Sequence, residues 1–319
     1  MNAQRGKRVL PVGGSGTRRA AMFALIAILV PVLSLSAATE DTLGLAGAES
    51  RLLWKPEWRR ASLPEVLVFG TLEGGALLFP LAVSPAKQPR WRGGILLDES
   101  VRSALLLGRT GQKIASTFSD AGLDVLEATP LVDAGISAWW YRGDRNTAFQ
   151  LSLMYAEAYS LTSILQVGLR AAFSRERPID HFQHCSDNDP ANPPGPKCSS
   201  AKNESFPSDH AAFSFTSAAM TCTQHANIAL YGNVNDKLVC AEALTLATGV
   251  SVARVMKDKH WSTDILAGAA VGTLSGWAVP HFLHFRMKPP LGEHGLVSGV
   301  TVLPMVGPGS AGLSLLGEL

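Results

Sequence analysis

A long segment without proline, residues 147–173, gives the clearest structural signal in this sequence. It is rich in leucine, alanine and methionine, which favour the α-helix, and Asp144 or Thr147 can cap its start. Pro178 prevents the helix from continuing much further. Helical patterns also cover residues 98–127, 129–143, 237–256 and the stretches that follow Pro207 and His260. We therefore predict an all-α fold, a helical bundle.

The regions on either side of this body differ from it in composition. Residues 39–64 are mixed and polar and are interpreted as an N-terminal arm. The helical domain is expected over residues 65–297, with a buried helix over 66–83. Residues 298–319 alternate between apolar and small residues around Gly307-Pro308-Gly309, a pattern typical of a two-stranded β-hairpin.

The first 38 residues resemble a targeting segment. Five basic residues and no acidic ones precede an uncharged apolar stretch over 20–38. This order predicts a secretory signal peptide over residues 1–38, and the alternative is a retained anchor, because the stretch is long enough to span a bilayer. We expect an exported protein of the periplasm or cell envelope, soluble or anchored through this segment. The formal net charge of +2 argues against a nucleic-acid partner.

The remaining chain has no uncharged, proline-free apolar run of about 18 residues, the usual membrane-helix threshold. We therefore expect a soluble helical body. Entry of residues 66–83 or 265–279 into a membrane stays open, because Gly- and Ala-rich membrane helices escape this test.

The chain has four cysteines, and export permits them to form disulfides. Of the three connectivities that four cysteines allow, we favour the pairs closest in sequence, Cys185–Cys198 and Cys222–Cys240. Four buried thiols are the alternative. A zinc site is disfavoured because the sequence has no CxxC pair.

Three clusters carry the residues with chemical potential. They are Arg170 to Pro178 (RAAFSRERP), Phe206 to His210 (FPSDH) and Arg254 to Asp264 (RVMKDKHWSTD). Taken alone, each has an ordinary interpretation, respectively a solvated helix end, an N-terminal cap and a contact on a helix surface. Their joint occurrence in this order favours a shared site.

Together these residue types describe a pocket for a tetrahedral oxyanion. His260 and Asp264 share a helix face, so the carboxylate can hold Nδ1–H and leave Nε2 free. Pro207 fits the first turn of a helix whose N-terminal N–H groups attract anions. Arginine side chains match phosphate oxygens in a bidentate fashion.

In combination, the clusters resemble the signature of the type 2 phosphatidic acid phosphatase and vanadium haloperoxidase superfamily. That signature is Lys, six residues and Arg-Pro; then Pro-Ser-Gly-His; then Ser-Arg, five residues, His, three residues and Asp. The spacings match throughout, with three departures: Arg170 replaces Lys, Asp209 replaces Gly and Ala253 replaces Ser. The resemblance implies a helical bundle of this kind, and the hairpin is similar to that of exported bacterial members.

The resemblance also implies a metal-independent phosphomonoesterase that uses a phosphohistidine intermediate. His260 would attack phosphorus, Asp264 would orient it, and His210 would protonate the leaving alkoxide and then activate water. The phosphate-binding residues would be Arg170, Arg177, Ser208, Asp209 and Arg254. No metal or cofactor is implied, and the negative charge of Asp209 is expected to raise the pKa of His210.

The partner would be a phosphate-ester substrate, either a membrane lipid or a small ester, with association at a membrane surface. Two alternatives remain at this point. One is a vanadate-dependent haloperoxidase that uses the same pocket, and the other is a non-catalytic exported anion-binding module.

Overall fold

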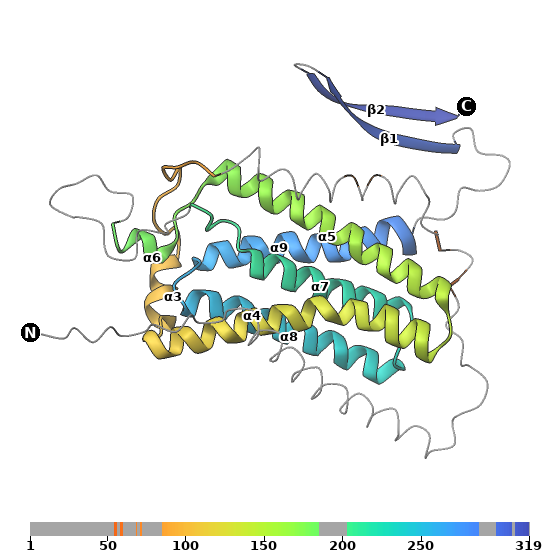
Figure 1. Ribbon diagram of the computed structural model, residues 1–319, viewed down its shortest axis with the longest axis horizontal. Helices are drawn as coiled ribbons and strands as arrows, with labels where there is room; N and C mark the ends of the chain where they lie inside the picture. The colour runs from red at the N-terminus through yellow and green to blue at the C-terminus, as the bar shows by residue number, and fades with distance from the viewer. Residues whose placement is uncertain are drawn as a thin grey trace, which may run out of the picture.

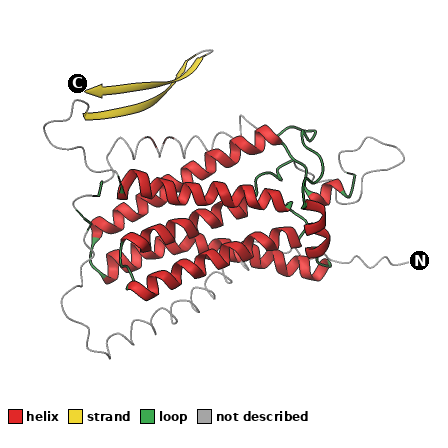
Figure 2. Ribbon diagram, turned by 180° about the vertical axis from the view of Figure 1, so that it is seen from behind, coloured by secondary structure: helices red, strands yellow, loops and turns green. Residues whose placement is uncertain are grey.

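The computed structural model describes residues 54–55, 58–59, 68, 71, 85–184, 203–286, 298–307 and 310–318. Long helices side by side dominate this part of the chain (Figures 1 and 2). They are α3 (Asp98–Leu105), α4 (Arg109–Val132), α5 (Arg145–Phe173), α6 (Pro178–His181), α7 (Asp209–Asn227), α8 (Asn233–Met256) and α9 (Ser262–Ala278). The π-helical segments η1 (Asp133–Tyr141) and η3 (Val279–Phe285) continue α4 and α9. The predicted all-α bundle is confirmed.

The predicted central helix is α5, and its ends follow local sequence signals. Asp144 caps it, because its carboxylate accepts a hydrogen bond from the Thr147 backbone N–H at 2.9 Å. It ends where Ser174 adopts the left-handed conformation, with a φ of 41°. A separate helix over 129–143 was the wrong expectation, because α4 continues through Pro130 and then widens into η1. Proline has no N–H to donate, so the regular α-helical pattern is interrupted there.

Helix α7 lies at the centre of the bundle and contacts α4, α5, α8 and α9. Three glycines of α9, each four residues apart, face its backbone: Gly268, Gly272 and Gly276. A Cβ at Gly272 would lie only 2.0 Å from the carbonyl oxygen of Ala212. These glycines allow close packing of the two helices, and this packing fixes the start of α9 against the start of α7.

Two clusters of buried apolar side chains form the core. One joins α5, α7 and the η segments, and Trp54 and Trp58 pack into it, with the Trp58 ring centroid 5.0 Å from that of Phe285. The other lies between α4, α7 and α8. Two described residues of the predicted arm, Trp54 and Trp58, are thus part of the core.

Cys222 of α7 and Cys240 of α8 form a disulfide, as we predicted, with Cα atoms 4.6 Å apart. The other predicted pair, Cys185–Cys198, lies outside the described residues.

The predicted C-terminal hairpin is also present. Strands β1 (Ser298–Gly307) and β2 (Ser310–Glu318) are antiparallel, and Gly307 pairs with Ser310 at the turn. The signal peptide over 1–38 lies outside the described residues, as does all of the expected helix over 66–83 except residues 68 and 71, which are helical.

Two of the helical stretches, Val234–Met256 and Ser262–Phe285, are long and apolar enough to cross a membrane. Only 39% and 33% of the residues in their most apolar windows are buried. Large exposed side chains along them include Val234, Leu238, Leu244, Leu266, Leu274, Trp277 and Phe282. These helices suggest membrane association rather than the fully soluble body that we expected. The expectation required uncharged runs, whereas these helices carry isolated charges.

Candidate active site

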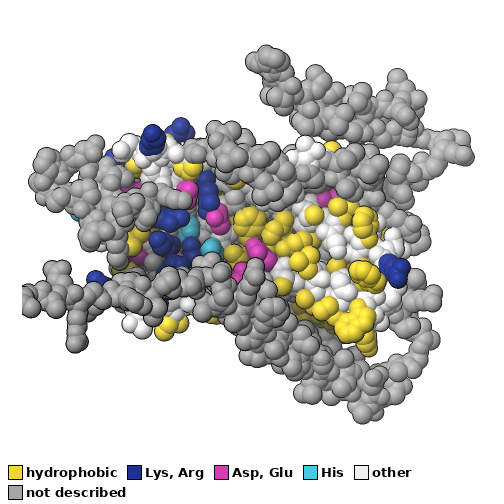
Figure 3. Space-filling view, viewed as in Figure 1, with side chains coloured by type: hydrophobic (Ala, Val, Ile, Leu, Met, Phe, Trp, Pro, Cys, Tyr) yellow, Lys and Arg dark blue, Asp and Glu magenta, His cyan; other side chains and the backbone are white. Residues whose placement is uncertain are grey.

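The predicted site residues come together at one end of the bundle, where α5 ends and α7 begins. On the face shown in Figure 3, lysine and arginine side chains gather there beside histidines. The positions come from the end of α5, the loop before α6, the start of α7, the end of α8 and the start of α9: Arg170, Arg177, Ser208, Asp209, His210, Arg254, His260 and Asp264. The charges of Arg254, Arg177 and Arg170 all act on the His260 imidazole.

His260 is buried, with 2% of its surface exposed. Its Nδ1 lies 2.8 Å from the backbone carbonyl oxygen of Ser205. Because a carbonyl oxygen only accepts hydrogen bonds, Nδ1 carries the hydrogen and Nε2 keeps its lone pair. Burial lowers the pKa of His260 well below its ordinary value, and the nearby arginines lower it further. The ring is therefore a neutral imidazole that can act as a nucleophile.

Asp264 does not hold His260 directly, in contrast to the expected hydrogen bond. Its Oδ2 lies 3.9 Å from His260 Nδ1. It instead accepts hydrogen bonds from the Ser205 hydroxyl at 2.6 Å and from the Trp261 backbone N–H at 2.8 Å. Ser205 thus links the two residues, because its hydroxyl binds Asp264 and its carbonyl binds His260. The i, i+4 spacing misled the prediction because α9 begins at Ser262, so His260 precedes the helix.

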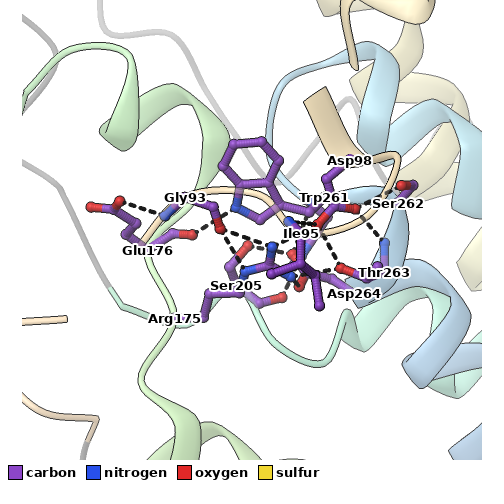
Figure 4. Close-up of polar contacts among 11 residues, drawn as sticks. Gly93, Ile95, Asp98, Arg175, Glu176, Ser205, Trp261, Ser262, Thr263 and Asp264 are labelled. Carbon is purple, nitrogen blue, oxygen red and sulfur yellow. Dashed lines mark hydrogen bonds and ion pairs between the residues drawn. The ribbon is translucent and has the colours of Figure 1, made fainter. Parts of the chain in front are cut away.

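Arg175 stabilises this arrangement through polar contacts with several of its neighbours (Figure 4). It is fully buried, and its guanidinium binds Asp264 at 2.6 Å and Asp98 at 2.7 Å. It also donates to the Gly93 carbonyl at 2.9 Å, and the Trp91 ring lies 3.9 Å from its central carbon. Arg175 therefore ties the segment before α3 to the start of α9.

Sequence reasoning missed both Arg175 and Asp98. Arg175 stands inside the first cluster, but its burial follows from packing that the sequence does not display. Asp98 begins a helical pattern in a region without any recognised motif, and its bonds with Thr263 and Ser262 span about half of the chain.

Four donors of the predicted phosphate-binding residues lack partners. The Nε atoms of Arg170, Arg177 and Arg254 and the hydroxyl of Ser208 are buried without a hydrogen bond to any described residue. Buried polar groups are normally paired, so unpaired donors from three arginines and a serine at this end of the bundle are suited to an oxyanion. We call these four residues the phosphate cup.

The start of α7 adds backbone donors to the cup. Ser208 is the N-cap residue and Asp209 is the first residue of the helix, so Pro207 lies before the helix rather than in its first turn as expected. The Ser208 side chain makes no capping bond, which leaves its hydroxyl available. The first N–H groups of a helix have no intrahelical partner and attract anions.

His210 lies at the rim of the cup. Its Nε2 is 2.9 Å from Asp120 Oδ1 and 3.3 Å from Arg254 Nη1. Burial lowers the pKa of His210, although the hydrogen bond that its ring donates to Asp120 and the charge of Asp209 oppose this change. The charge of Asp209 therefore raises the pKa of His210, as we expected, but burial outweighs this effect. Asp120, on α4, is a further site residue that sequence reasoning missed.

No group of three or more His, Cys, Asp or Glu side chains among the described residues could hold a metal ion. The cup offers hydrogen-bond donors and positive charge, which suit an oxyanion such as phosphate or vanadate rather than a cation.

Comparison with known proteins agrees with the signature. Residues 150–288 match the family model of the PAP2 superfamily, and this segment includes every predicted site residue. No curated protein sequence matches the chain. A solved structure, the first transmembrane PAP2 type phosphatidylglycerolphosphate phosphatase from Bacillus subtilis, is similar at 19% identity, covering 72% of this chain and 96% of that chain with a TM-score of 0.43. The helices that carry the site are thus similar to those of the PAP2 superfamily.

Proposed function

We propose that this protein is a metal-independent phosphatase that hydrolyses a phosphate monoester through a phosphohistidine at His260. One observation carries the proposal: three arginines whose charges act on the His260 imidazole have a buried Nε without a partner among the described residues, and the neutral imidazole keeps the lone pair on Nε2. The match of residues 150–288 to the PAP2 superfamily model supports a phosphatase-type function.

In the first step, His260 Nε2 attacks phosphorus and the bond to the leaving oxygen breaks. His210 gives its proton to that oxygen as an alcohol leaves. The Ser205 carbonyl accepts Nδ1–H and stabilises the positive charge that develops on the ring. The phosphate cup stabilises the equatorial oxygens as charge shifts onto them.

In the second step, water attacks the phosphohistidine. His210 takes a proton from the water, the N–P bond breaks, and phosphate is released with His260 neutral again. The arginines supply the positive charge that Mg²⁺ supplies in other phosphoryl-transfer sites.

The substrate that we favour is a lipid phosphate. Arg254 lies in the last turn of the apolar helix α8, and His260 lies immediately before the apolar helix α9. The site therefore lies where α8 ends and α9 begins. A membrane around these helices would therefore present its headgroups near the cup. The Cys222–Cys240 disulfide supports an exported protein, because such bonds persist in oxidising compartments.

The test is phosphate release by the full chain from a long-chain alkyl phosphate and from a small aryl phosphate, with and without EDTA. We expect release that EDTA does not change and that His260→Ala reduces by at least about 10³-fold. Loss of activity in EDTA, or activity near wild type in His260→Ala, would contradict the mechanism. Halide oxidation with vanadate and peroxide, without phosphate release, would support the haloperoxidase instead.

A further inference from the structure

Each arginine of the phosphate cup also faces one carboxylate. Arg170 forms an ion pair with Asp209. Arg177 Nη2 lies 3.7 Å from Glu204 Oε2, and Arg254 Nη1 lies 3.6 Å from Asp120 Oδ1. All three carboxylates are more exposed than the arginines that they face. The cup is therefore less positive than its three arginines alone would make it.

The Arg170–Asp209 pair differs from the other two. It is a direct contact, whereas the others are separated by more than a hydrogen-bond length. Asp209 is also the first residue of α7, so its carboxylate lies at the helix end that attracts anions. Arg170 nevertheless keeps its buried Nε without a partner among the described residues.

Both members of this pair are departures from the superfamily signature. The signature has Lys where this chain has Arg170 and Gly where it has Asp209. Glycine has no side chain, so the ion pair cannot form in that pattern. Arginine, unlike lysine, can hold a carboxylate with one nitrogen and offer another nitrogen to a second anion. The two substitutions are therefore matched to one another.

We propose that Arg170 and Asp209 form a specificity pair that makes the site select phosphate monoesters in their singly charged, protonated form. A doubly charged phosphate at the cup would share Arg170 with a carboxylate and would be repelled by it. A phosphate oxygen that carries a proton can instead donate a hydrogen bond to Asp209. The inference rests on the proposed function, because it assumes that the cup binds the phosphate group.

Other charged groups also act on this part of the site, so the test must separate their effects. Those facing the pair or its neighbours are Asp120, Arg177, Glu204, His210, Arg254 and Lys257. Two tetrahedral probes of fixed charge avoid changes in their protonation, because they can be compared at a single pH. Sulfate carries two negative charges at neutral pH, and methanesulfonate carries one.

The experiment is titration calorimetry of the full chain with each probe. For Asp209→Asn, we expect sulfate to bind about tenfold more tightly than in the wild type, while methanesulfonate affinity changes by less than about threefold. The matched control is Glu204→Gln, which removes a carboxylate near Arg177 and should change sulfate affinity by less than about threefold. The double variant Arg170→Lys with Asp209→Gly restores the signature and should also bind sulfate more tightly.

Three results would overturn the specificity pair. They are unchanged sulfate affinity in both Asp209 variants, an equal gain for both probes, or the same gain in Glu204→Gln. Circular dichroism and the melting temperature establish that each variant is folded. Failure of the proposed function is distinguishable, because it would be seen as absent phosphate release in the wild type, whereas the calorimetric contrast needs no turnover.

Discussion

The two ends of helix α7 each hold a histidine among charged groups, and they differ in how those groups are paired. At the C-terminal end, His225 Nδ1 lies 2.6 Å from Asp236 and Nε2 lies 3.2 Å from Asp133, so both ring nitrogens are bound. Tyr231 also donates to Asp133. At the N-terminal end, the phosphate cup retains unpaired donors. Paired buried charges maintain a fold, whereas unpaired donors of one sign are available to a ligand.

The same contrast separates two buried arginines near the site. Arg175 donates through Nε, Nη1 and Nη2 to Gly93, Asp98, Thr263 and Asp264. Arg254 is also largely buried, yet its Nε has no partner among the described residues. We therefore infer that Arg175 stabilises the structure and that Arg254 serves the phosphate. Four predictions test this distinction.

The largest effect is expected from Arg175→Met. It would leave the Asp98 and Asp264 carboxylates buried without their cation. Removing one partner of a buried ion pair typically lowers the free energy of unfolding by about 3–5 kcal/mol. Denaturant unfolding of wild type and variant measures this difference. A decrease in the free energy of unfolding of less than about 1 kcal/mol would show that Arg175 does not stabilise the structure.

The same substitution at the other arginine, Arg254→Met, is the matched control. It should reduce activity strongly and leave stability intact. We expect kcat/KM for phosphate release to fall by about 10²–10³-fold, as for the loss of one charge-stabilising donor. The free energy of unfolding should stay the same or rise, because a partly unpaired charge leaves the interior. A loss of stability comparable to that of Arg175→Met would remove the distinction.

The paired histidine should make stability depend on pH. Burial opposes the charge of His225, but Asp133 and Asp236 outweigh it and raise the pKa from 6.5 to about 9. The contribution of protonated His225 to the free energy of unfolding is thus fully present below pH 6.5. It is lost as the pH rises through about 9, which lowers the free energy of unfolding by an amount on the order of 3 kcal/mol. Unfolding measured from pH 6 to 9.5 tests this. His225→Gln should be less stable at pH 6 and change much less across the range; equal slopes would refute the assignment.

The smallest effect is expected from Asp120→Asn. The Asp120 carboxylate opposes the effect of burial on His210, so its loss should lower the pKa of His210 further. His210 must carry a proton to act as the acid, and the fall of kcat/KM at high pH should therefore begin at a lower pH. The loss at neutral pH should be less than about tenfold. A pH–rate profile identical to that of the wild type would exclude this positioning role.

Local signals predicted much of this molecule. The helices α5, α7, α8 and α9 follow from runs of helix-forming residues and, for α5, from the cap at Asp144, because these signals lie within a few turns of chain. The signature predicted the cup because its spacings fix which helix ends carry the charged residues.

The remainder depends on contacts between distant segments. Asp120 reaches His210 from α4, Asp98 reaches Arg175 from the region before it, and Ser205 replaces Asp264 as the direct partner of His260. The partners in each of these contacts are far apart in the sequence, so no local pattern of residues predicts them. The pairing of Arg170 with Asp209 was also hidden, because the two departures stood in different clusters and were considered separately.

The central claim is that the buried, neutral His260 imidazole attacks a phosphorus atom held in the cup. Rapid quenching of the wild type in alkaline detergent with a ³²P-labelled substrate, followed by peptide mapping at alkaline pH, tests this step. We expect an acid-labile, base-stable phosphoryl group on the peptide that contains His260, and none in His260→Ala. Turnover without any phosphoenzyme in a quench series that spans the first turnover, or a phosphoryl group on another residue, would contradict it.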